Sequence, residues 1–572
     1  MSATDTTETH EVEAPAAEEE PVSDPWSPGT DHKVVGTLFV VVAMLFLVAA
    51  GVLALVMRAQ LAGPDGNLVG GTTYRQLFTL HGVLGVFGFL GPVWVGLATA
   101  VVPLQIGATR LAFPRLQSLA LWLVVVGGAM IVASPFLEGA KVVNGWALST
   151  PIPDGPGSAG HGPDLLILGL AVVATALVLA AVNLAVTILK MRAPGLTLRR
   201  TPLFSWSVLV SSSILLLALP VLVGSLVLVF VDRHYHGHIF NGFTGSGGGD
   251  PLLWPRLFWF AAYPTLWALL LPGLGVVSEI VPVAARRRMF SHQRATLALG
   301  AVGVLAFAGW GSQVPSLTRA RFIFAVGAVV VLLPVASLLL NWLVTAGMAV
   351  RQHTVAVSDL LTAPMVYAGG FIAVLGLGLV GWAAAVVSAS SAHADYWQVA
   401  TQHTLFFGTA TLAVVAALTY WAPKLWGHHL SDKASVPTAV LVAGGMVVTF
   451  AAMFVLGVQN MHVHRASFSD DSLTPANLVA SVGAAITGLG VLAFVADLIV
   501  NVIGGRGRKA DDDPWTGHTL EWATSSPPPS YNFDRLPEIR SEAPMLDLRT
   551  APTTETGPVG SPIAATVARA SS

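Results

Sequence analysis

Long apolar runs are the feature that most constrains how this chain can fold. Each run can cross the roughly 30 Å hydrocarbon core of a bilayer as a helix, and only 10% of the 572 residues are charged. This pattern predicts an all-α integral membrane protein of about twelve transmembrane helices. The predicted spans, of which 295–312 is the shortest, are 34–57, 78–103, 117–137, 164–188, 205–231, 255–283, 295–312, 322–350, 363–388, 399–423, 436–458 and 476–503.

Lys and Arg are distributed unevenly between the two sets of short loops. Positively charged loops tend to stay on the cytoplasmic side of a membrane. If residues 1–33 are cytoplasmic, most of the positive loops are cytoplasmic too. The pattern therefore predicts a multi-pass protein of the cell membrane with both termini in the cytoplasm. The positive residues concerned are Arg110, Arg115, Lys190, Arg192, Arg199, Arg200, Arg286, Arg287, Arg288, Arg294, Arg351, Lys424, Lys433, Arg506, Arg508 and Lys509.

Composition divides the chain into three parts. Residues 1–30 are acidic and contain Pro, Ser and Thr, which predicts a disordered tail. Residues 31–505 are predicted to form one transmembrane domain. Residues 506–572 are polar and proline-rich, and they are predicted to be a cytoplasmic tail that lies against the bundle or a partner. Because no long soluble loop interrupts the membrane domain, any chemistry is expected between its helices.

The chain contains no cysteine. This excludes iron–sulfur clusters, covalently attached c-type heme, thiolate metal sites and disulfides. A bound metal must therefore use histidine, methionine, carboxylate or backbone ligands. The net charge of −2 gives no indication of a nucleic-acid partner, and the expected surroundings are the lipid bilayer.

Two histidines lie inside predicted spans, His81 in 78–103 and His403 in 399–423. An ionisable side chain within a membrane is costly and marks a functional site. Both spans run inward, and each histidine lies just past the outer end, so a rise of about 1.5 Å per residue places them at similar depth. Two such imidazoles can hold a heme iron axially in a low-spin centre. Each could instead be a neutral core histidine, because periodicity does not show that the two spans touch.

Short motifs follow one another in a fixed order between residues 31 and 533. They include Asp31-His32-Lys33, Gln76-Leu77-Phe78-Thr79-Leu80-His81-Gly82, Val102-Pro103-Leu104-Gln105-Ile106-Gly107, Gly247-Gly248-Gly249-Asp250-Pro251 and Thr519-Leu520-Glu521-Trp522. In this order they resemble subunit I of the heme-copper (cytochrome c) oxidases, which implies that family's twelve-helix fold and a place in a respiratory chain. The resemblance also implies that His81 and His403 are the axial ligands of a low-spin heme. Arg58 falls where the family contacts the formyl group of that heme, which favours heme A over heme B, or it is an ordinary interfacial arginine.

The chain departs from the family at the oxygen-reducing site. The family's His-Pro-Glu-Val-Tyr, Trp-Ala-His-His-Met and His-Phe-His are here Tyr263-Pro264-Thr265-Leu266-Trp267, Trp310-Gly311-Ser312-Gln313-Val314 and Thr401-Gln402-His403. By resemblance, Tyr263, Ser312 and Gln313 replace the three copper histidines. Hydroxyl and amide groups are poor substitutes for imidazole on copper, so copper is not expected. Thr401 replaces the proximal ligand of the high-spin heme.

Proton-carrying positions of the family are altered as well. By resemblance, Thr265 occupies the position of the family's proton-delivering glutamate. Trp267 occupies the position of the tyrosine that supplies a proton and an electron. Arg110 and Leu338 occupy the positions of the carboxylate and the lysine of the two uptake channels. These replacements imply that neither oxygen reduction nor proton pumping is carried out by this chain.

Three functions stay open on sequence alone. The first is electron transfer or assembly by a member of the family that binds one low-spin heme, of A or B type, and has no catalytic residue of its own. The second is an active terminal oxidase, and the third is a heme-free structural or assembly subunit. The resemblance implies partners of the subunit II and III type, with cytochrome c or a quinol as the donor.

Overall fold

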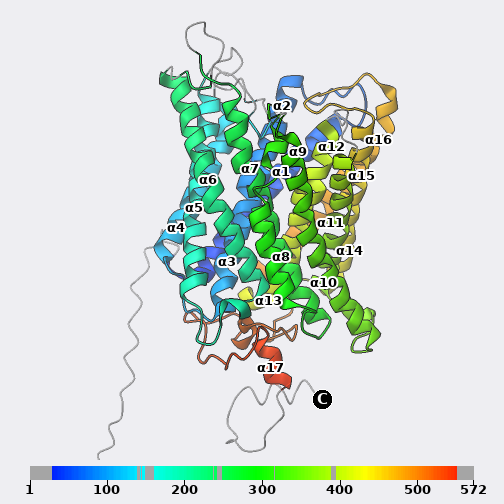
Figure 1. The fold of residues 1–572 in the computed structure, drawn as a ribbon. Helices are drawn as coiled ribbons and strands as arrows, with labels where there is room; N and C mark the ends of the chain where they lie inside the picture. Colours follow the sequence, from blue (N-terminus) through cyan, green and yellow to red (C-terminus); the bar gives the residue numbers. More distant parts are fainter. Residues whose placement is uncertain are drawn as a thin grey trace, which may run out of the picture.

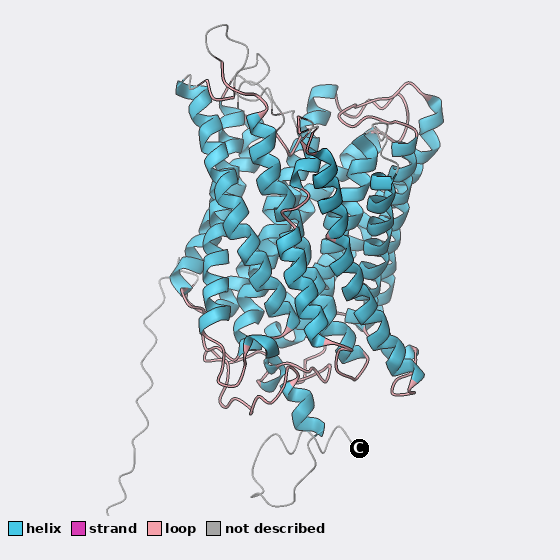
Figure 2. Cartoon of the chain, in the orientation of Figure 1, coloured by secondary structure: helices cyan, strands magenta, loops and turns pink. Residues whose placement is uncertain are grey.

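The computed structural model is a bundle of long helices that run between the two ends of the molecule (Figure 1). It describes residues 29–137, 142, 145–148, 160–235, 238–240, 248–314, 316–317, 319–387 and 395–550. Within these ranges the regular structure is helical, with no β-strand (Figure 2). Eleven helical segments of the described chain are long and apolar enough to cross a membrane. The prediction of an all-α membrane bundle is confirmed.

The first half of the bundle begins at His32, where the Asp31 carboxylate accepts a hydrogen bond from the Lys33 N–H and caps the helix. Neighbouring helices pack in chain order over α4, α5, α6 and α7, whereas α1 packs on α3. The helices are α1 (His32–Gln60), α2 (Gly71–Val83), α3 (Gly91–Ile106), α4 (Pro114–Ala133), α5 (His161–Lys190), α6 (Leu203–Tyr235) and α7 (Leu253–Ala284).

The second half contains shorter helices that combine into membrane-length segments. α12, α13 and the turn between them form one span, as do α14 and α15. The helices are α8 (His292–Leu305), α9 (Arg321–Val330), α10 (Leu332–Arg351), α11 (Ala363–Val387), α12 (Asp395–Gln402), α13 (Gly408–Trp426), α14 (Asp432–Ala439), α15 (Gly445–Val458), α16 (Thr474–Asp497) and α17 (Pro544–Thr550).

The predicted span 295–312 differs from the others. Its helix, α8, has 14 residues and ends at Leu305, and the chain then continues irregularly to a 3₁₀ turn at Trp310–Gln313. A helix of this length rises about 21 Å, which is short of the bilayer core. The apolar run therefore corresponds to a helix too short to cross the bilayer core, followed by an irregular segment that packs against the bundle.

Three spans form the centre of the bundle. In Gly71–Ile106, Leu253–Ala284 and Tyr396–Trp426, between 94% and 100% of the most apolar window is buried, against 22% to 61% in the other spans. A helix that is apolar all round must be enclosed by other helices. The side chains of these three spans therefore face protein, which makes them the natural place for a site.

Two of the central spans contain a π-helical segment. Leu84–Leu90 separates α2 from α3, and His403–Phe407 separates α12 from α13. Such wide turns occur frequently at functional sites. His81 lies just before the first segment and His403 opens the second, so both histidines lie where their helices are locally irregular.

Residues 506–550 pack across one end of the bundle, called here the tail-side end (Figure 1). The ammonium group of the buried Lys424 donates to the backbone carbonyls of Asp512, Thr524 and Ser525. His32, at the start of α1, is hydrogen-bonded to the Asn532 side chain. Both ends of the described chain therefore lie at the tail-side end.

Replacing a glycine at the crossing of α1 and α3 should destabilise the bundle. A Cβ at Gly96 would lie 2.8 Å from the Gly36 carbonyl oxygen. We expect Gly96→Val to lower the free energy of unfolding by about 1–3 kcal/mol through overpacking, measured as a lower thermal midpoint in detergent. Gly224→Val, where a Cβ meets nothing within 4 Å, is the matched control. Equal midpoints for the two variants would contradict the close crossing.

Candidate functional site

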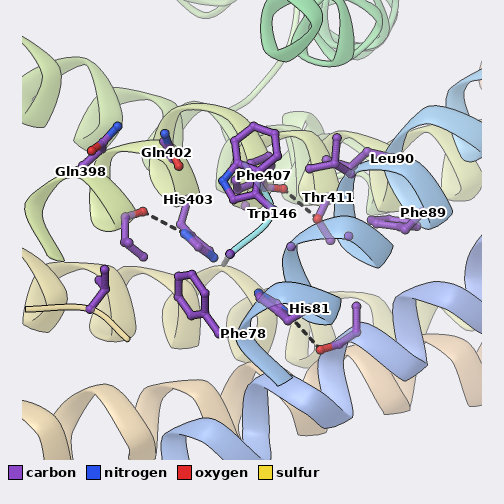
Figure 3. A pocket seen from close by; sticks show the side chains of 18 of the residues that line it. Phe78, His81, Phe89, Leu90, Trp146, Gln398, Gln402, His403, Phe407 and Thr411 are labelled. Carbon is purple, nitrogen blue, oxygen red and sulfur yellow. Dashed lines mark hydrogen bonds between the residues drawn. The ribbon is translucent and has the colours of Figure 1, made fainter. Parts of the chain in front are cut away.

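The two intramembrane histidines come together in the middle of the site. The ring centroids of His81 and His403 lie 6.1 Å apart, and the ring planes differ by only 6°. Figure 3 shows the imidazoles on opposite sides of a cavity, each pointing toward the other. The structure thus brings together the two residues that the sequence could place only at similar depth.

Backbone carbonyls fix the orientation of both rings. Nδ1 of His81 is 3.0 Å from the Ala50 carbonyl oxygen, and Nδ1 of His403 is 2.8 Å from that of Val399. A carbonyl only accepts, so each Nδ1 carries the proton and donates it. The lone pair of each Nε2 then faces the other ring. Metal-binding histidines usually have their second nitrogen held in this way.

The ring separation fits one metal ion between the two Nε2 atoms. An imidazole nitrogen binds a transition metal at about 2 Å, and ring bonds of about 1.3–1.4 Å place the nitrogen about 1.1 Å from the centroid. Two rings aligned on one ion would therefore have centroids about 6.2 Å apart. The observed 6.1 Å matches this separation.

Two adjoining cavities flank the histidine pair. The larger has a volume of about 340 Å³ and the smaller about 260 Å³, and both are lined by His81 and His403. Gly51 lines both cavities and Gly85 lines the larger, and a Cβ at either would meet nothing within 4 Å. The space beside the rings is therefore broad enough for a flat organic group, in the size range of ordinary cofactor sites.

Arg58 extends from α1 toward the smaller cavity, where its buried guanidinium is incompletely satisfied. Its NH2 donates to the Asn477 side-chain oxygen at 3.0 Å, and its charge lies 5.9 Å from the Tyr396 ring centroid. NH1 is buried without a hydrogen-bond partner. A buried cationic donor of this kind can bind an oxygen substituent of a ligand.

The positions in α7 where the sequence predicts that family site residues are lost are filled by packed side chains. Tyr263, Thr265 and Trp267 are each at most 2% exposed. The Trp267 ring meets the Phe406 ring edge-on at 5.0 Å, and Trp382 contacts both Tyr263 and Phe406. The Thr265 hydroxyl donates to the Ala261 carbonyl. These side chains form an aromatic cluster, here defined as Tyr263, Trp267, Trp382 and Phe406.

Ser312, Gln313 and Thr401, where the sequence also predicts that ligands are lost, satisfy their polar groups locally. The Ser312 hydroxyl donates to the Gly309 carbonyl, and the Thr401 hydroxyl donates to the Trp397 carbonyl. Gln313 donates to Ser312 and accepts from Gln398. Across the ranges that the structure describes, no three His, Asp or Glu side chains are placed to hold a metal ion.

Sequence reasoning did not identify several contributors to this site. The Ala50 and Val399 carbonyls are backbone groups and carry no sequence signal. Asn477 binds Arg58 from a helix more than 400 positions along the chain. His464 is exposed and also lines the larger cavity, with its ring centroid 4.6 Å from that of Phe78.

The fold and the site define a class of protein: a polytopic helical membrane protein with two opposed imidazoles that line a cavity between its central helices. The chain belongs to the family described as cytochrome c and quinol oxidase polypeptide I, whose model matches residues 34–486. This is subunit I of the heme-copper oxidases, a family of respiratory electron transport.

Known relatives cover nearly the whole chain. It is 36% identical to a putative cytochrome c oxidase subunit 1-beta of Streptomyces coelicolor, over 91% of this chain and 90% of that protein. It is 34% identical to cytochrome c oxidase subunit 1 of Corynebacterium diphtheriae, over 91% of each. A heme-copper terminal oxidase dimer solved by cryo-EM shares the fold, with a TM-score of 0.64 at 18% identity over 82% of this chain and 83% of that one.

Replacing Asn477 should lower the stability of the protein, because the buried Arg58 guanidinium would lose a hydrogen bond. In Asn477→Leu the guanidinium loses its side-chain acceptor, and a buried donor left without a partner costs about 1–3 kcal/mol. We expect the thermal midpoint of the purified protein to fall accordingly. Asn67→Leu, at an exposed position, serves as the control. An unchanged midpoint in Asn477→Leu would show that the hydrogen bond contributes nothing to stability.

Proposed function

We propose that this chain binds one low-spin heme between His81 and His403 and uses it to transfer electrons in a respiratory membrane complex. The observation that carries the proposal is the pair of parallel imidazoles at 6.1 Å with both Nδ1 atoms held by carbonyls. A heme whose iron was held by both His81 and His403 would have no position left for oxygen, so it would supply electron transfer and not oxygen binding.

The chain's own residues have defined roles in this function. His81 and His403 hold the iron, and the Ala50 and Val399 carbonyls keep the two rings in the required tautomer. The heme supplies the one-electron redox chemistry. The carbonyls hold the two rings so that they do not reorient, which keeps the free-energy cost of changing the charge on the iron low.

The surroundings favour heme A over heme B. Arg58 NH1 is an unpaired donor at the edge of the smaller cavity and suits a formyl oxygen. That cavity is lined largely by apolar side chains of α1, α15 and α16, which suits a long apolar ring substituent. Heme B has neither group, so a B-type heme would leave this donor and this space unused.

We further propose that this chain has no oxygen-reduction or proton-pumping site. The family's copper site needs three imidazoles, and this chain has a phenol, a hydroxyl and an amide at those positions. The phenol of Tyr263 packs in the aromatic cluster, and Ser312 and Gln313 form local hydrogen bonds. Relatives named cytochrome c oxidase subunit 1 favour the alternative, an active terminal oxidase. The chemistry of the ligands in this chain weighs against that alternative.

The proposal includes a partner complex. A buried heme with no substrate of its own must receive and pass on electrons through other subunits, of the subunit II or III type, with cytochrome c or a quinol as the donor. The excess of Lys and Arg in one set of loops supports a plasma-membrane orientation with both termini in the cytoplasm.

Replacing either histidine should abolish heme binding. The dithionite-reduced spectrum of the purified protein is expected to show low-spin heme bands that disappear in His81→Ala and in His403→Ala, because each change removes an axial ligand. His161→Ala, at a side chain that is 86% exposed, should keep the bands. Bands that survive in both ligand variants would refute the assignment. A wild-type protein with no bands would favour a heme-free structural subunit.

Carbon monoxide and copper separate electron transfer from oxygen reduction. A six-coordinate heme has no free position, so the reduced protein should give no carbon monoxide difference spectrum. Metal analysis should find iron without stoichiometric copper. A carbon monoxide adduct together with one bound copper per chain would establish the active oxidase instead.

A further inference from the structure

A small polar cavity lies at the tail-side end of the bundle, far from the histidine pair along the helices. Its volume is about 30 Å³. Its walls combine the start of α6, α7 and α8 with the tail, and the polar residues that line it are Ser278, Glu279, Arg288, His292, His518, Thr519 and Glu542. A space of this size holds one or two water molecules when its walls are polar.

Glu279 is the membrane-embedded acid of this cavity. It is 7% exposed, in a span whose apolar window is fully buried. Its Oε1 accepts from the Phe204 N–H at 3.1 Å, at the start of α6. A buried carboxylate with so few donors is expensive to keep ionised.

Glu521 is a second acid, completely buried in the tail and close enough to interact electrostatically with Glu279. Its Oε1 accepts from Gln105 Nε2 at 3.1 Å and from Trp421 Nε1 at 3.3 Å, whereas Oε2 has no partner. Ser205 donates to Gln105 and links this group to α6. Burial raises the pKa of the Glu521 carboxyl above its usual range.

Thr519 connects the cavity with Glu521. It is 3% exposed and lines the cavity, and its hydroxyl has no partner of acceptable geometry. The hydroxyl also lies beside the Glu521 carboxyl. Buried polar groups are nearly always satisfied, so the unpaired Thr519 hydroxyl and the unpaired Glu521 Oε2 bond either to each other or to water at the wall of the cavity.

The other titratable groups around the cavity define its charge. Burial, together with the charges of Arg549 and Arg288, lowers the pKa of His518 to about 4, so its ring is neutral at pH 7. Burial also lowers the pKa of His292. Arg288 pairs with Glu542 at the rim. No three groups of the described chain are placed to hold a metal, so water fits this cavity better than a metal cation does.

Further charges lie on the tail side of Glu521. The ammonium of Lys424 lies 5.4 Å from the Trp522 ring centroid and attracts the Glu521 carboxylate. Asp513 is paired with Arg549. The buried Tyr420 hydroxyl, like Thr519, has no partner. Lys424 is therefore shared among the carboxylates of Asp512, Asp513 and Glu521.

We propose that this cavity is a proton-binding site in which ordered water joins Glu279 and Glu521 to the tail-side aqueous phase and the two carboxyls hold one proton between them. The proton comes from that aqueous phase through the water and returns the same way, and no bond other than O–H forms or breaks. Like-charged carboxylates close together raise each other's proton affinity, which favours the shared state.

Infrared spectroscopy of the purified full-length protein tests the proposal. At neutral pH the wild type should show the C=O stretch of a protonated carboxyl, shifted in D₂O. The band should be absent in the double variant Glu279→Gln and Glu521→Gln and present in Glu538→Gln, an exposed acid of the tail. A wild type without the band, or a double variant that keeps it, would overturn the proposal.

A second variant tests the water route without removing an acid. Thr519→Val keeps the shape of the side chain and removes the hydroxyl, so the D₂O shift of the band should develop on the order of ten-fold more slowly. An unchanged exchange rate would overturn the role of the cavity water. Elution and circular dichroism will show whether the double variant folds. If it does not, the presence of the wild-type band and the exchange rate in Thr519→Val still test the proposal. None of these measurements uses a heme signal, so they do not depend on the proposed function.

Discussion

The site depends on one constraint: two imidazoles from separate spans must be held at the same depth with their planes parallel. A buried imidazole has two nitrogens to satisfy, and an unsatisfied buried polar atom costs about 1–3 kcal/mol. Here the chain satisfies one nitrogen of each ring with a carbonyl and turns the other into the cavity. The three central spans make this possible, because only an enclosed helix can hold a side chain against protein on every side.

Much of the fold was predictable because a bilayer simplifies the physics. An apolar run of membrane length has few alternatives to a helix, and the helical rise alone placed His81 and His403 at one depth. The run 295–312 shows the limit of this reasoning. Hydropathy marks it as a span, but a Cβ at Gly309 would lie 2.4 Å from the Tyr263 hydroxyl. Such close packing of irregular chain is set by tertiary contacts, not by hydropathy.

The site was predictable only in its charged and aromatic side chains. Histidine and arginine inside a membrane are conspicuous, whereas the carbonyls of Ala50 and Val399 have no signature in a sequence. Long-range pairs were equally hidden: Arg58 with Asn477, and Gln105 with Glu521, join segments more than 400 positions apart. Glu279 and Glu521 become neighbours only because the tail folds back onto the bundle.

If the second metal centre is absent, as proposed, the side chains at Tyr263, Thr265, Trp267 and Thr401 explain how the bundle stays packed without it. A metal centre that is removed leaves a cavity unless side chains fill it, and cavities destabilise. Here large rings occupy the volume, and the small polar residues bond to their own helices. This packing leaves the Tyr263 hydroxyl and the Trp267 N–H buried without a hydrogen-bond partner, which costs free energy of folding.

The two proposed sites are too far apart to control one another strongly. The Trp267 ring contacts Phe406, three residues beyond His403, and Glu279 follows Trp267 on the same helix by about 18 Å of helical rise. At that distance and an effective dielectric constant of about 20, two unit charges interact by about 1 kcal/mol or less. An electron at the histidine pair would therefore change proton affinity at Glu279 by less than about tenfold. Proton binding at the tail-side end then follows the pH of the aqueous phase and not the redox state of the membrane site.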